Sequence, residues 1–397
     1  MALAGQEITV LGAGVAGLAL ARALALKGAR VTLLEQADAI REVGAGLQVS
    51  PNGAVVLRAL GLGAALDAAS MRAQAVQLLD GCRGDQVVRL DLARLRPAQT
   101  YHFVHRSDLI DLLAEGARAA GVDIRLLQRV ASVDLSGPRP RITTDQGDVM
   151  TPALLIGADG LNSTTRAALN GMVAPFFTRQ VAWRAIIPAE PGIAPVAEVH
   201  MGAGRHLVSY PLRGGTLRNI VAVEERSRWA EEGWSLRDDP MELRLAFAGF
   251  SPRVRGWLEQ IEDVWLWGLF RHPVAKCWFQ VLPEGAVAIL GDAAHPTLPF
   301  LSQGSAMALE DAWVLADCLN SFETAAVALA EYQGRRLART ARVVAASGTN
   351  AAIYHAKGVR RLGRDAGLRL LAAVAPGAPL KRFDWLYGVD VTKAGTR

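Results

Sequence analysis

The sequence predicts an α/β protein in which strands and helices of one layered unit are interrupted by an inserted antiparallel sheet and followed by a helical C-terminal region. Three observations predict it. Strand-to-helix units with glycine or an acid at the strand end begin near residues 8, 154 and 285. Alternating, tryptophan-containing segments occupy residues 176–279, and helical apolar spacing returns between residues 324 and 374.

The first strand-to-helix unit is a complete βαβ pattern over residues 8–35. Gly12 and Gly14 of its Gly-x-Gly-x-x-Gly turn let the backbone bend and approach a pyrophosphate, and Gly17 lets the helix pack closely on the sheet. Glu35 ends the second strand, where a carboxylate can accept hydrogen bonds from ribose hydroxyls. The unit is therefore Rossmann-like and predicts a dinucleotide site.

Two later units repeat this strand-to-helix arrangement, with an acid at the end of an apolar strand. Asp159 and Gly160 follow the strand near residue 154, and Asp292 follows the apolar run 285–290. An acid there can accept hydrogen bonds from hydroxyls, while the helix that begins near Gly304 offers backbone N–H groups and a positive dipole to an anionic group. Two alternatives stay open: Asp292 as a helix cap, and Asp-Gly as a turn chosen for conformation.

The three units, in this order, resemble those of the flavin-dependent aromatic hydroxylases, in the salicylate-hydroxylase-like branch of the p-hydroxybenzoate hydroxylase fold. The resemblance implies noncovalent FAD, NADH or NADPH as a transient co-substrate, O₂, and hydroxylation of a small aromatic substrate through a flavin C4a-hydroperoxide. The substrate would be phenolic, benzoate-like or an N-heterocyclic acid. Nothing in the sequence distinguishes the two nicotinamides, because the single glycine motif and Glu35 belong to FAD.

The resemblance also assigns individual residues. In such enzymes the aspartate at the position of Asp292 binds the ribityl chain, and the helix from Gly304 faces the pyrimidine side of the flavin. Arg106 would contact the ribityl-phosphate region, and the alternative is a surface arginine just before a helix. Ser107 is the expected cap of that helix. The full set expected at the cofactor is Gly12, Gly14, Ala16, Gly17, Glu35, Gln36, Arg41, Gln48, Arg106, Val130, Asp159, Gly160, Asp292, Pro299 and Gly304.

The units also suggest how the chain is divided. We expect a discontinuous FAD-binding domain over residues 1–75, 96–175 and 280–322. A sheet domain that covers the substrate would comprise residues 76–95 and 176–279, and residues 323–397 would form the helical region. The segment 383–390 resembles the closing segment of the family.

His206, Tyr210 and Gln48 are the expected catalytic residues. His206, Val208 and Tyr210 share one face of a strand, because the side-chain period of a strand is two. Branches of the family place a histidine and a tyrosine at this spacing against the aromatic substrate, and Gln48 would lie at the edge of that site. The alternative for His206 is an exposed strand histidine. His295 is expected to be structural.

Composition excludes several other classes. The net charge of +5 comes from 43 Lys and Arg against 38 Asp and Glu, but these are scattered, so no nucleic-acid surface is expected. Cys82, Cys277 and Cys318 have neither disulfide-framework nor metal-ligand spacing, which favours no metal and a reducing cytoplasm. The apolar stretch 8–26 contains Arg22 and motif glycines, so it predicts neither a signal peptide nor a membrane span. A homodimer stays open.

Two other flavoprotein classes use similar fingerprints. A halogenase would carry Trp-x-Trp-x-Ile-Pro, and Trp265 and Trp267 match only its first half. A flavin-bound sensor or electron-transfer protein would share the cofactor motifs, and stimulation of NAD(P)H consumption by an aromatic compound would distinguish it from a hydroxylase.

Overall fold

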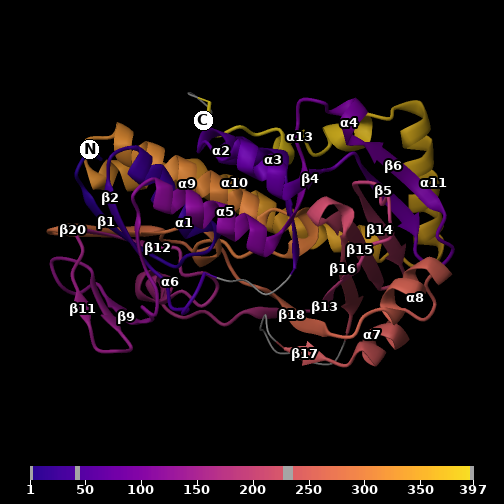
Figure 1. Ribbon diagram of the computed structural model, residues 1–397, viewed down its shortest axis with the longest axis horizontal. Helices are drawn as coiled ribbons and strands as arrows, with labels where there is room; N and C mark the ends of the chain where they lie inside the picture. Colours follow the sequence, from indigo (N-terminus) through magenta and orange to yellow (C-terminus); the bar gives the residue numbers. More distant parts are fainter. Residues whose placement is uncertain (1–2, 41–44, 227–235, 394–397) are drawn as a thin grey trace.

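Six strands form the sheet that carries the three strand-to-helix units (Figure 1). The computed structural model describes residues 3–40, 45–226 and 236–393, without the side chains of residues 349–352. The strand order is β19 (Phe279–Leu282), β20 (Gly285–Ile289), β12 (Leu154–Gly157), β1 (Glu7–Leu11), β2 (Arg30–Leu34) and β8 (Asp123–Arg125). All neighbours pair in parallel except β19 and β20, so the Rossmann-like expectation is confirmed.

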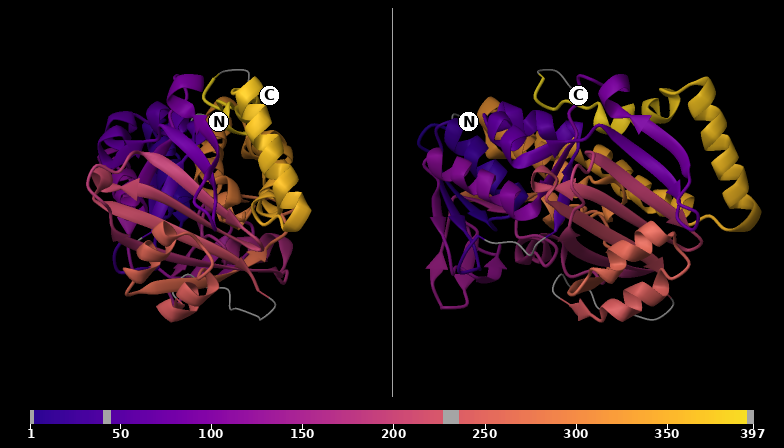
Figure 2. Two further views of the ribbon diagram at one scale, coloured as in Figure 1. Left: turned by 90° about the vertical axis from the view of Figure 1, so that its right-hand side faces the viewer. Right: turned by 45° about the vertical axis from the view of Figure 1, so that its right-hand side comes forward.

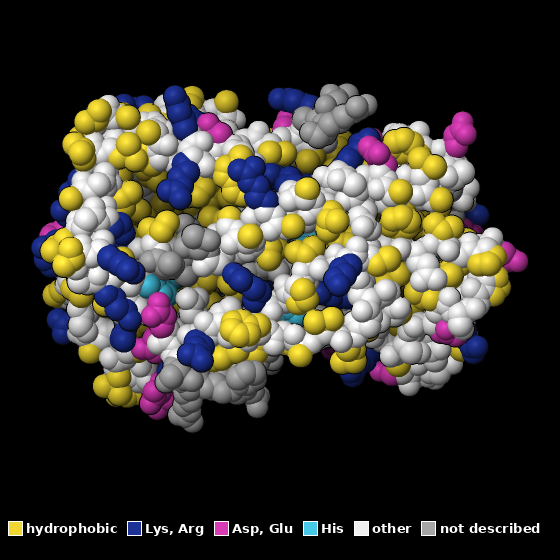
Figure 3. Space-filling model, turned by 180° about the vertical axis from the view of Figure 1, so that it is seen from behind, with side chains coloured by type: hydrophobic (Ala, Val, Ile, Leu, Met, Phe, Trp, Pro, Cys, Tyr) yellow, Lys and Arg dark blue, Asp and Glu magenta, His cyan; other side chains and the backbone are white. Residues whose placement is uncertain are grey.

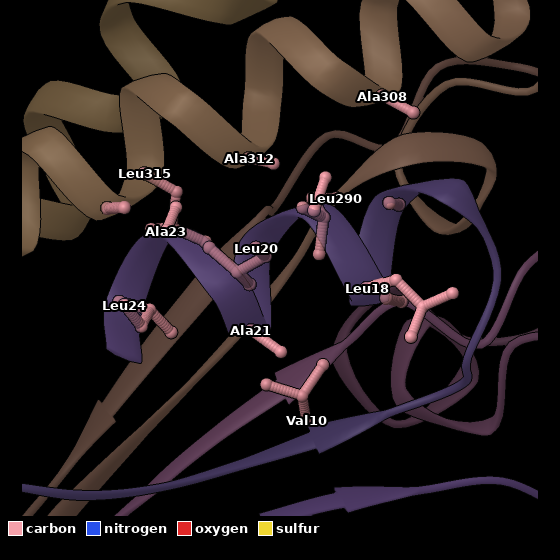
Figure 4. Close-up of a cluster of buried hydrophobic side chains, with 14 of the residues drawn as sticks. Val10, Leu18, Leu20, Ala21, Ala23, Leu24, Leu290, Ala308, Ala312 and Leu315 are labelled. Atoms are coloured by element: carbon pink, nitrogen blue, oxygen red, sulfur yellow. The ribbon is translucent and has the colours of Figure 1, made fainter. Parts of the chain in front are cut away.

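Helices α1 (Val15–Leu26) and α9 (Gly304–Ser321) pack on this sheet as two successive layers. Figure 4 shows Val10 of the sheet below α1, with Ala312 and Leu315 of α9 on the other side of the same helix. Alanine and leucine dominate the contact, so the two backbones approach closely around residues that carry no polar atoms. Helices α5 (Arg106–Ala119) and α10 (Ala325–Tyr354) pack beside them.

A second sheet of eight strands stands on the right in Figure 1. Its order is β17 (Arg237–Asp238), β18 (Val264–Arg271), β13 (Phe176–Pro188), β16 (Leu217–Glu225), β15 (Arg205–Leu212), β14 (Val196–Gly202), β5 (Ala75–Asp80) and β6 (Gln86–Asp91). Neighbours are antiparallel except β14 and β5, so a strand pair from far earlier in the chain completes this sheet. Helices α7 (Pro240–Ala246) and α8 (Pro252–Glu259) cover one of its faces, which leaves the other free to line a cavity.

The C-terminal region is helical, as expected. After α10 come α11 (Gly358–Val374), α12 (Ala378–Lys381) and α13 (Asp384–Tyr387). Figure 2 shows α11, in yellow, at the outside of the molecule, and this helix packs along the β6 edge of the eight-stranded sheet. The predicted fold class, with two unlike sheets and a helical C-terminal region, is therefore confirmed.

Smaller elements connect these layers. They comprise the strands β3 (Gly46–Val49), β7 (His102–His105) and β4 (Ser70–Arg72), the hairpin sheet β9 (Val130–Asp134), β10 (Arg141–Thr144) and β11 (Val149–Met150), and the helices α2 (Pro51–Ala59), α3 (Gly63–Ala69), α4 (Leu92–Leu95) and α6 (Thr164–Asn170). One predicted cap is wrong. Helix α5 begins at Arg106 with His105 as its N-cap, and the Ser107 hydroxyl lies 2.7 Å from Nδ1 of His105.

Two acids in α9 that interrupt its apolar pattern are fully buried. Glu310 and Asp311 meet Arg336 of α10, whose guanidinium donates at 2.6 Å to each carboxylate. Asp311 also accepts hydrogen bonds from His295 Nε2 at 2.5 Å and from the backbone N–H of Gly291 at 3.0 Å. The cluster therefore ties α9, α10 and the end of β20 together.

We predict that Arg336→Met lowers the free energy of unfolding by about 3–5 kcal/mol, because it leaves two buried carboxylates without their cation. The measurement is chemical denaturation of the FAD-loaded protein. Arg335→Met is the matched control on the same helix. Arg335 pairs with Glu331 at the surface, where an ion pair contributes about 0–1 kcal/mol. Equal stability losses in the two variants would contradict the structural role of the cluster.

Candidate active site

One large cavity lies between the two sheets, with a volume of about 1350 Å³. Its wall includes residues at the carboxyl ends of four parallel strands: Gly12 and Glu35 directly follow β1 and β2, and Asp159 and Asp292 come shortly after β12 and β20. Ligands of open α/β sheets bind at these carboxyl ends. Ordinary small-molecule pockets measure about 300–1,000 Å³, so this cavity has room for a dinucleotide and a further small ring.

Nearly all of the predicted site residues line this cavity. They are Gly12, Gly14, Ala16, Glu35, Gln36, Gln48, Arg106, Val130, Asp159, Gly160, His206, Tyr210, Asp292, Pro299 and Gly304. Gly17 is not among the lining residues, because it packs beneath the turn. Arg41 lies outside the described residues.

The glycine turn has the geometry that a pyrophosphate requires. Gly12 has φ +95°, and a Cβ at this position would lie 2.6 Å from the carbonyl oxygen of Ala158. A Cβ on Gly17 would lie 1.9 Å from the carbonyl oxygen of Gly12, so side chains are excluded at both positions. Helix α1 begins behind Gly14 without a side-chain cap, which leaves its first N–H groups available to an anion.

Glu35 is held in place by the backbone. Its Oε2 accepts from the N–H of Ala13 at 2.7 Å, and its Oε1 accepts from the N–H of Ala37 at 2.9 Å. The carboxylate therefore stands at the end of β2 with remaining lone pairs for sugar hydroxyls.

Asp159 and Asp292 reach the same cavity with different surroundings. Asp159 accepts from Ser163 Oγ and from the N–H and Oγ1 of Thr165, so its carboxylate mainly fixes the turn that presents Gly160. The Asp292 side chain is exposed to the cavity. Desolvation by the surrounding protein raises the pKa of Asp292, against the nearby positive charges. A partly desolvated carboxylate of this kind gains from hydroxyl donors such as those of a ribityl chain.

Gln48 of β3 is oriented by two hydroxyl donors. Its Oε1 accepts from Tyr101 Oη at 2.7 Å and from Ser302 Oγ at 3.0 Å. With the oxygen occupied, the amide group of Gln48 is left to donate into the cavity.

His206 and Tyr210 lie on the cavity face of β15, as their spacing predicts. The His206 ring lies 5.1 Å from the Tyr354 ring and 5.8 Å from the Phe300 ring, and Tyr210 stacks on Phe103 at 5.1 Å. Burial lowers the pKa of His206 well below its ordinary value and raises that of Tyr210. At neutral pH the histidine is therefore neutral and can accept a proton, and the tyrosine keeps its own.

Arg184 of β13 is a site residue that sequence reasoning missed. Its guanidinium carbon lies 3.8 Å above the ring of Trp267. Arg184 lines the cavity, and Trp267 lines a small second pocket that also includes Arg184. Burial lowers the pKa of Arg184 to about 9, so its positive charge persists at neutral pH. Trp267, which belongs to the half-match to the halogenase motif, is explained by this contact: it is a residue of β18 that packs against Arg184. No sequence signal marked Arg184, because alternation along a strand does not tell which face meets a ligand.

The C-terminal helices contribute more to the cavity wall than the sequence indicated. Leu368 and Leu371 of α11 and Tyr387 of α13 line the cavity, and the Tyr387 hydroxyl donates to the carbonyl oxygen of Leu301 at 3.2 Å. The C-terminal helices therefore form part of the site.

Across the residues that the structure describes, no group of three or more His, Cys, Asp or Glu side chains could hold a metal ion. Over the same ranges, no helix combines the length and the hydropathy that crossing a membrane requires. The face seen in Figure 3 shows Lys and Arg side chains spread among hydrophobic ones, without a continuous basic block.

The family described as FAD binding domain matches residues 6–347 of the chain. The chain is 33% identical to a 3-hydroxybenzoate 6-hydroxylase of Polaromonas naphthalenivorans, covering 97% of this chain and 96% of the relative. It is 32% identical to a 3-amino-4-hydroxybenzoate 2-monooxygenase of Streptomyces platensis, covering 98% of each.

Solved structures share the fold. A salicylate hydroxylase in complex with its substrate superposes with a TM-score of 0.80 at 23% identity, over 98% of this chain and 97% of the other. HpxO of Klebsiella pneumoniae, complexed with FAD and uric acid, gives 0.79 at 24% identity, over 92% and 93%.

We predict that Asp292→Ala weakens FAD binding by about ten- to a hundredfold, since a hydrogen bond to a charged group contributes about 1.5–3 kcal/mol. The dissociation constant is measured by quenching of flavin fluorescence as the apoprotein is titrated. Asp292→Asn, which keeps one acceptor oxygen, should lose less. Asp317→Ala, at an exposed position of α9, is the control and should bind FAD normally. Unchanged FAD affinity in Asp292→Ala would remove this aspartate from the site.

Proposed function

The chain belongs to the FAD-dependent aromatic hydroxylases, and from that premise we propose that it hydroxylates a small phenolic acid whose proton is taken by His206. The observation that carries this proposal is that His206 and Tyr210 face the same cavity as Asp292 and Gly304. A substrate ring held by β15 would thus lie against the cofactor. FAD, once reduced by NADH or NADPH, supplies the activated oxygen from O₂.

The wall around His206 is suited to an aromatic ring. Val208, Val221 and Val223 line the cavity beside it and exclude water from the reacting face. An aromatic ring without its phenolic proton is richer in electrons, and a neutral histidine within reach of the hydroxyl can remove that proton. Tyr210, protonated because burial raises its pKa, can donate a hydrogen bond to the same oxygen.

Two groups in the cavity wall are suited to binding an acidic substituent on the substrate ring. Arg184 brings a positive charge, and the Gln48 amide brings N–H donors. These groups and the relatives' activities on hydroxybenzoates favour a hydroxybenzoate or aminohydroxybenzoate as substrate. The cytoplasm as location is supported by the three free cysteines, and a homodimer remains a prediction.

A substrate panel tests the proposal. Hydroxybenzoates, aminohydroxybenzoates, simple phenols and hydroxynicotinates are offered with NADH and with NADPH, and product mass, nicotinamide oxidation and hydrogen peroxide are recorded. Oxidation of the nicotinamide that rises with a phenolic acid and yields a product one oxygen heavier is the expected result. Absence of any hydroxylated product across the panel would contradict it.

His206→Ala should lower the rate of hydroxylation by about 10²–10⁴ while nicotinamide oxidation continues, because the base is lost but the flavin site is not. The difference should appear as hydrogen peroxide, which is measured beside the product. His200→Ala is the matched control: this buried histidine of the neighbouring strand β14 pairs with Glu198 and packs on Trp257. Full coupling in His206→Ala would make His206 a bystander.

Tyr210→Phe should raise the substrate's dissociation constant by about two- to tenfold, the equivalent of one neutral hydrogen bond, with little change in kcat. The stacking on Phe103 is retained, so the wall keeps its shape. Steady-state kinetics with the best substrate of the panel separate the two parameters. A fall in kcat with unchanged affinity would assign Tyr210 to the chemical step.

A further inference from the structure

A chain of hydrogen bonds joins the cavity histidine to the protein surface. Nδ1 of His206 lies 2.7 Å from Nε2 of His355, and Nδ1 of His355 lies 2.9 Å from Oε1 of Glu225. The two histidines are 2% and 3% exposed, whereas the Glu225 side chain is 42% exposed. The three residues therefore span the distance from the cavity wall to solvent.

The Glu225 carboxylate determines which atom donates in each of these hydrogen bonds. The Glu225 carboxylate can only accept, so Nδ1 of His355 must carry the proton. Nε2 of neutral His355 is then an acceptor, and Nδ1 of His206 must donate to it. This leaves a lone pair on Nε2 of His206, whose side chain lines the cavity.

We propose that His206, His355 and Glu225 form a proton relay that carries the phenolic proton of the substrate out of the cavity to solvent. The inference rests on the proposed function and adds His355 and Glu225 to it. The O–H bond of the phenol breaks as its proton joins Nε2 of His206, the Nδ1 proton of His206 moves to Nε2 of His355, and the Nδ1 proton of His355 leaves through Glu225. Each histidine ends neutral, and the substrate is left as the phenolate.

The surroundings favour movement of the positive charge outward. On His206 the charge would lie between the rings of Phe300 and Tyr354, in a place that burial makes unfavourable to it. On His355 it would be paired with the Glu225 carboxylate, which opposes the effect of burial on the pKa of His355. The other charges that act on His355 are those of Lys357 and Arg205, and both oppose protonation.

Backbone hydrogen bonds hold the three residues of the relay in position, although these residues are far apart in sequence. His206 belongs to β15, Glu225 ends β16, and His355 follows α10. The N–H of Gly204 donates to the carbonyl oxygen of His355 at 3.2 Å, and the N–H of Glu225 donates to the carbonyl oxygen of Gly204 at 2.8 Å. The turn before β15 thus clamps both outer members of the relay.

Ionisation of a bound nitrophenol measures the relay without turnover. The FAD-loaded protein, without NAD(P)H, is titrated with 4-hydroxy-3-nitrobenzoate, and phenolate is followed by difference absorbance against pH and by stopped flow. Glu225→Gln and His355→Gln should each slow phenolate formation by about tenfold or more. The equilibrium pKa of the bound probe should change little, because each histidine of the relay ends neutral. His355→Gln keeps an acceptor for His206 but cannot carry a proton, so the loss is one of transfer and not of orientation.

Lys357→Ala is the control. It removes a largely exposed cation that lies 3.4 Å from Glu225 and leaves the relay intact, so it should leave the rate of phenolate formation unchanged. Free imidazole should restore part of the rate in His355→Ala, which has space for it.

Histidine side-chain NMR gives a test that needs no probe. The relay requires a proton on Nδ1 and none on Nε2 in both His206 and His355 of the resting protein. The opposite tautomer of His206, or rates of phenolate formation equal to wild type in Glu225→Gln and His355→Gln, would overturn the proposal. Impaired ionisation in a protein that hydroxylates no phenol would contradict the proposed function and leave the relay standing.

Discussion

The position of Asp292 in the cavity wall depends on a buried ionic cluster centred on Arg336. Its guanidinium bridges Glu310 and Asp311, and Asp311 in turn holds the backbone of Gly291 and the ring of His295. Although burial opposes ionisation, His295 and Arg336 lower the pKa of Asp311 to about 2, so the cluster stays charged across the physiological range. The strand end that presents Asp292, the start of α9 and the middle of α10 are therefore one rigid unit.

The same cluster extends to the substrate side. Asn52 of α2 donates to Gln303 at 3.0 Å and to Glu310 at 2.7 Å, so the segment that follows β3 is tied to the start of α9. Gln48 lies on that strand, and Ser302, one of its two donors, directly precedes Gln303. This hydrogen-bonded network therefore fixes the distance between the expected flavin motif before α9 and the candidate catalytic residue Gln48. The packing of leucine and alanine side chains alone would not fix that distance.

Sequence patterns predicted the fold class, and most of the predicted site residues line the cavity, because strand-to-helix units with Gly12, Asp159 or Asp292 near the strand end have short-range signatures. The strand period placed His206 and Tyr210 on one face for the same reason. His355, Glu225 and Arg184 had no such signature: each reaches the site through contacts between distant segments. Ser107 was misjudged because the side chain of His105 competes for its hydroxyl. Glu310 and Asp311 interrupt the apolar pattern of α9 in the sequence, and only the structure shows that Arg336 is their partner.

The pairing of distant strands has a consequence for the order in which the protein can assemble during synthesis. Strand β5 must wait for β14, and β12 lacks its neighbour β20 until the whole inserted sheet has left the ribosome. Until then the edges of β12 and β5 offer unpaired backbone groups to other chains. Because Arg336 follows later still, the cofactor site closes only after most of the polypeptide has been made, and free FAD can select only nearly complete chains.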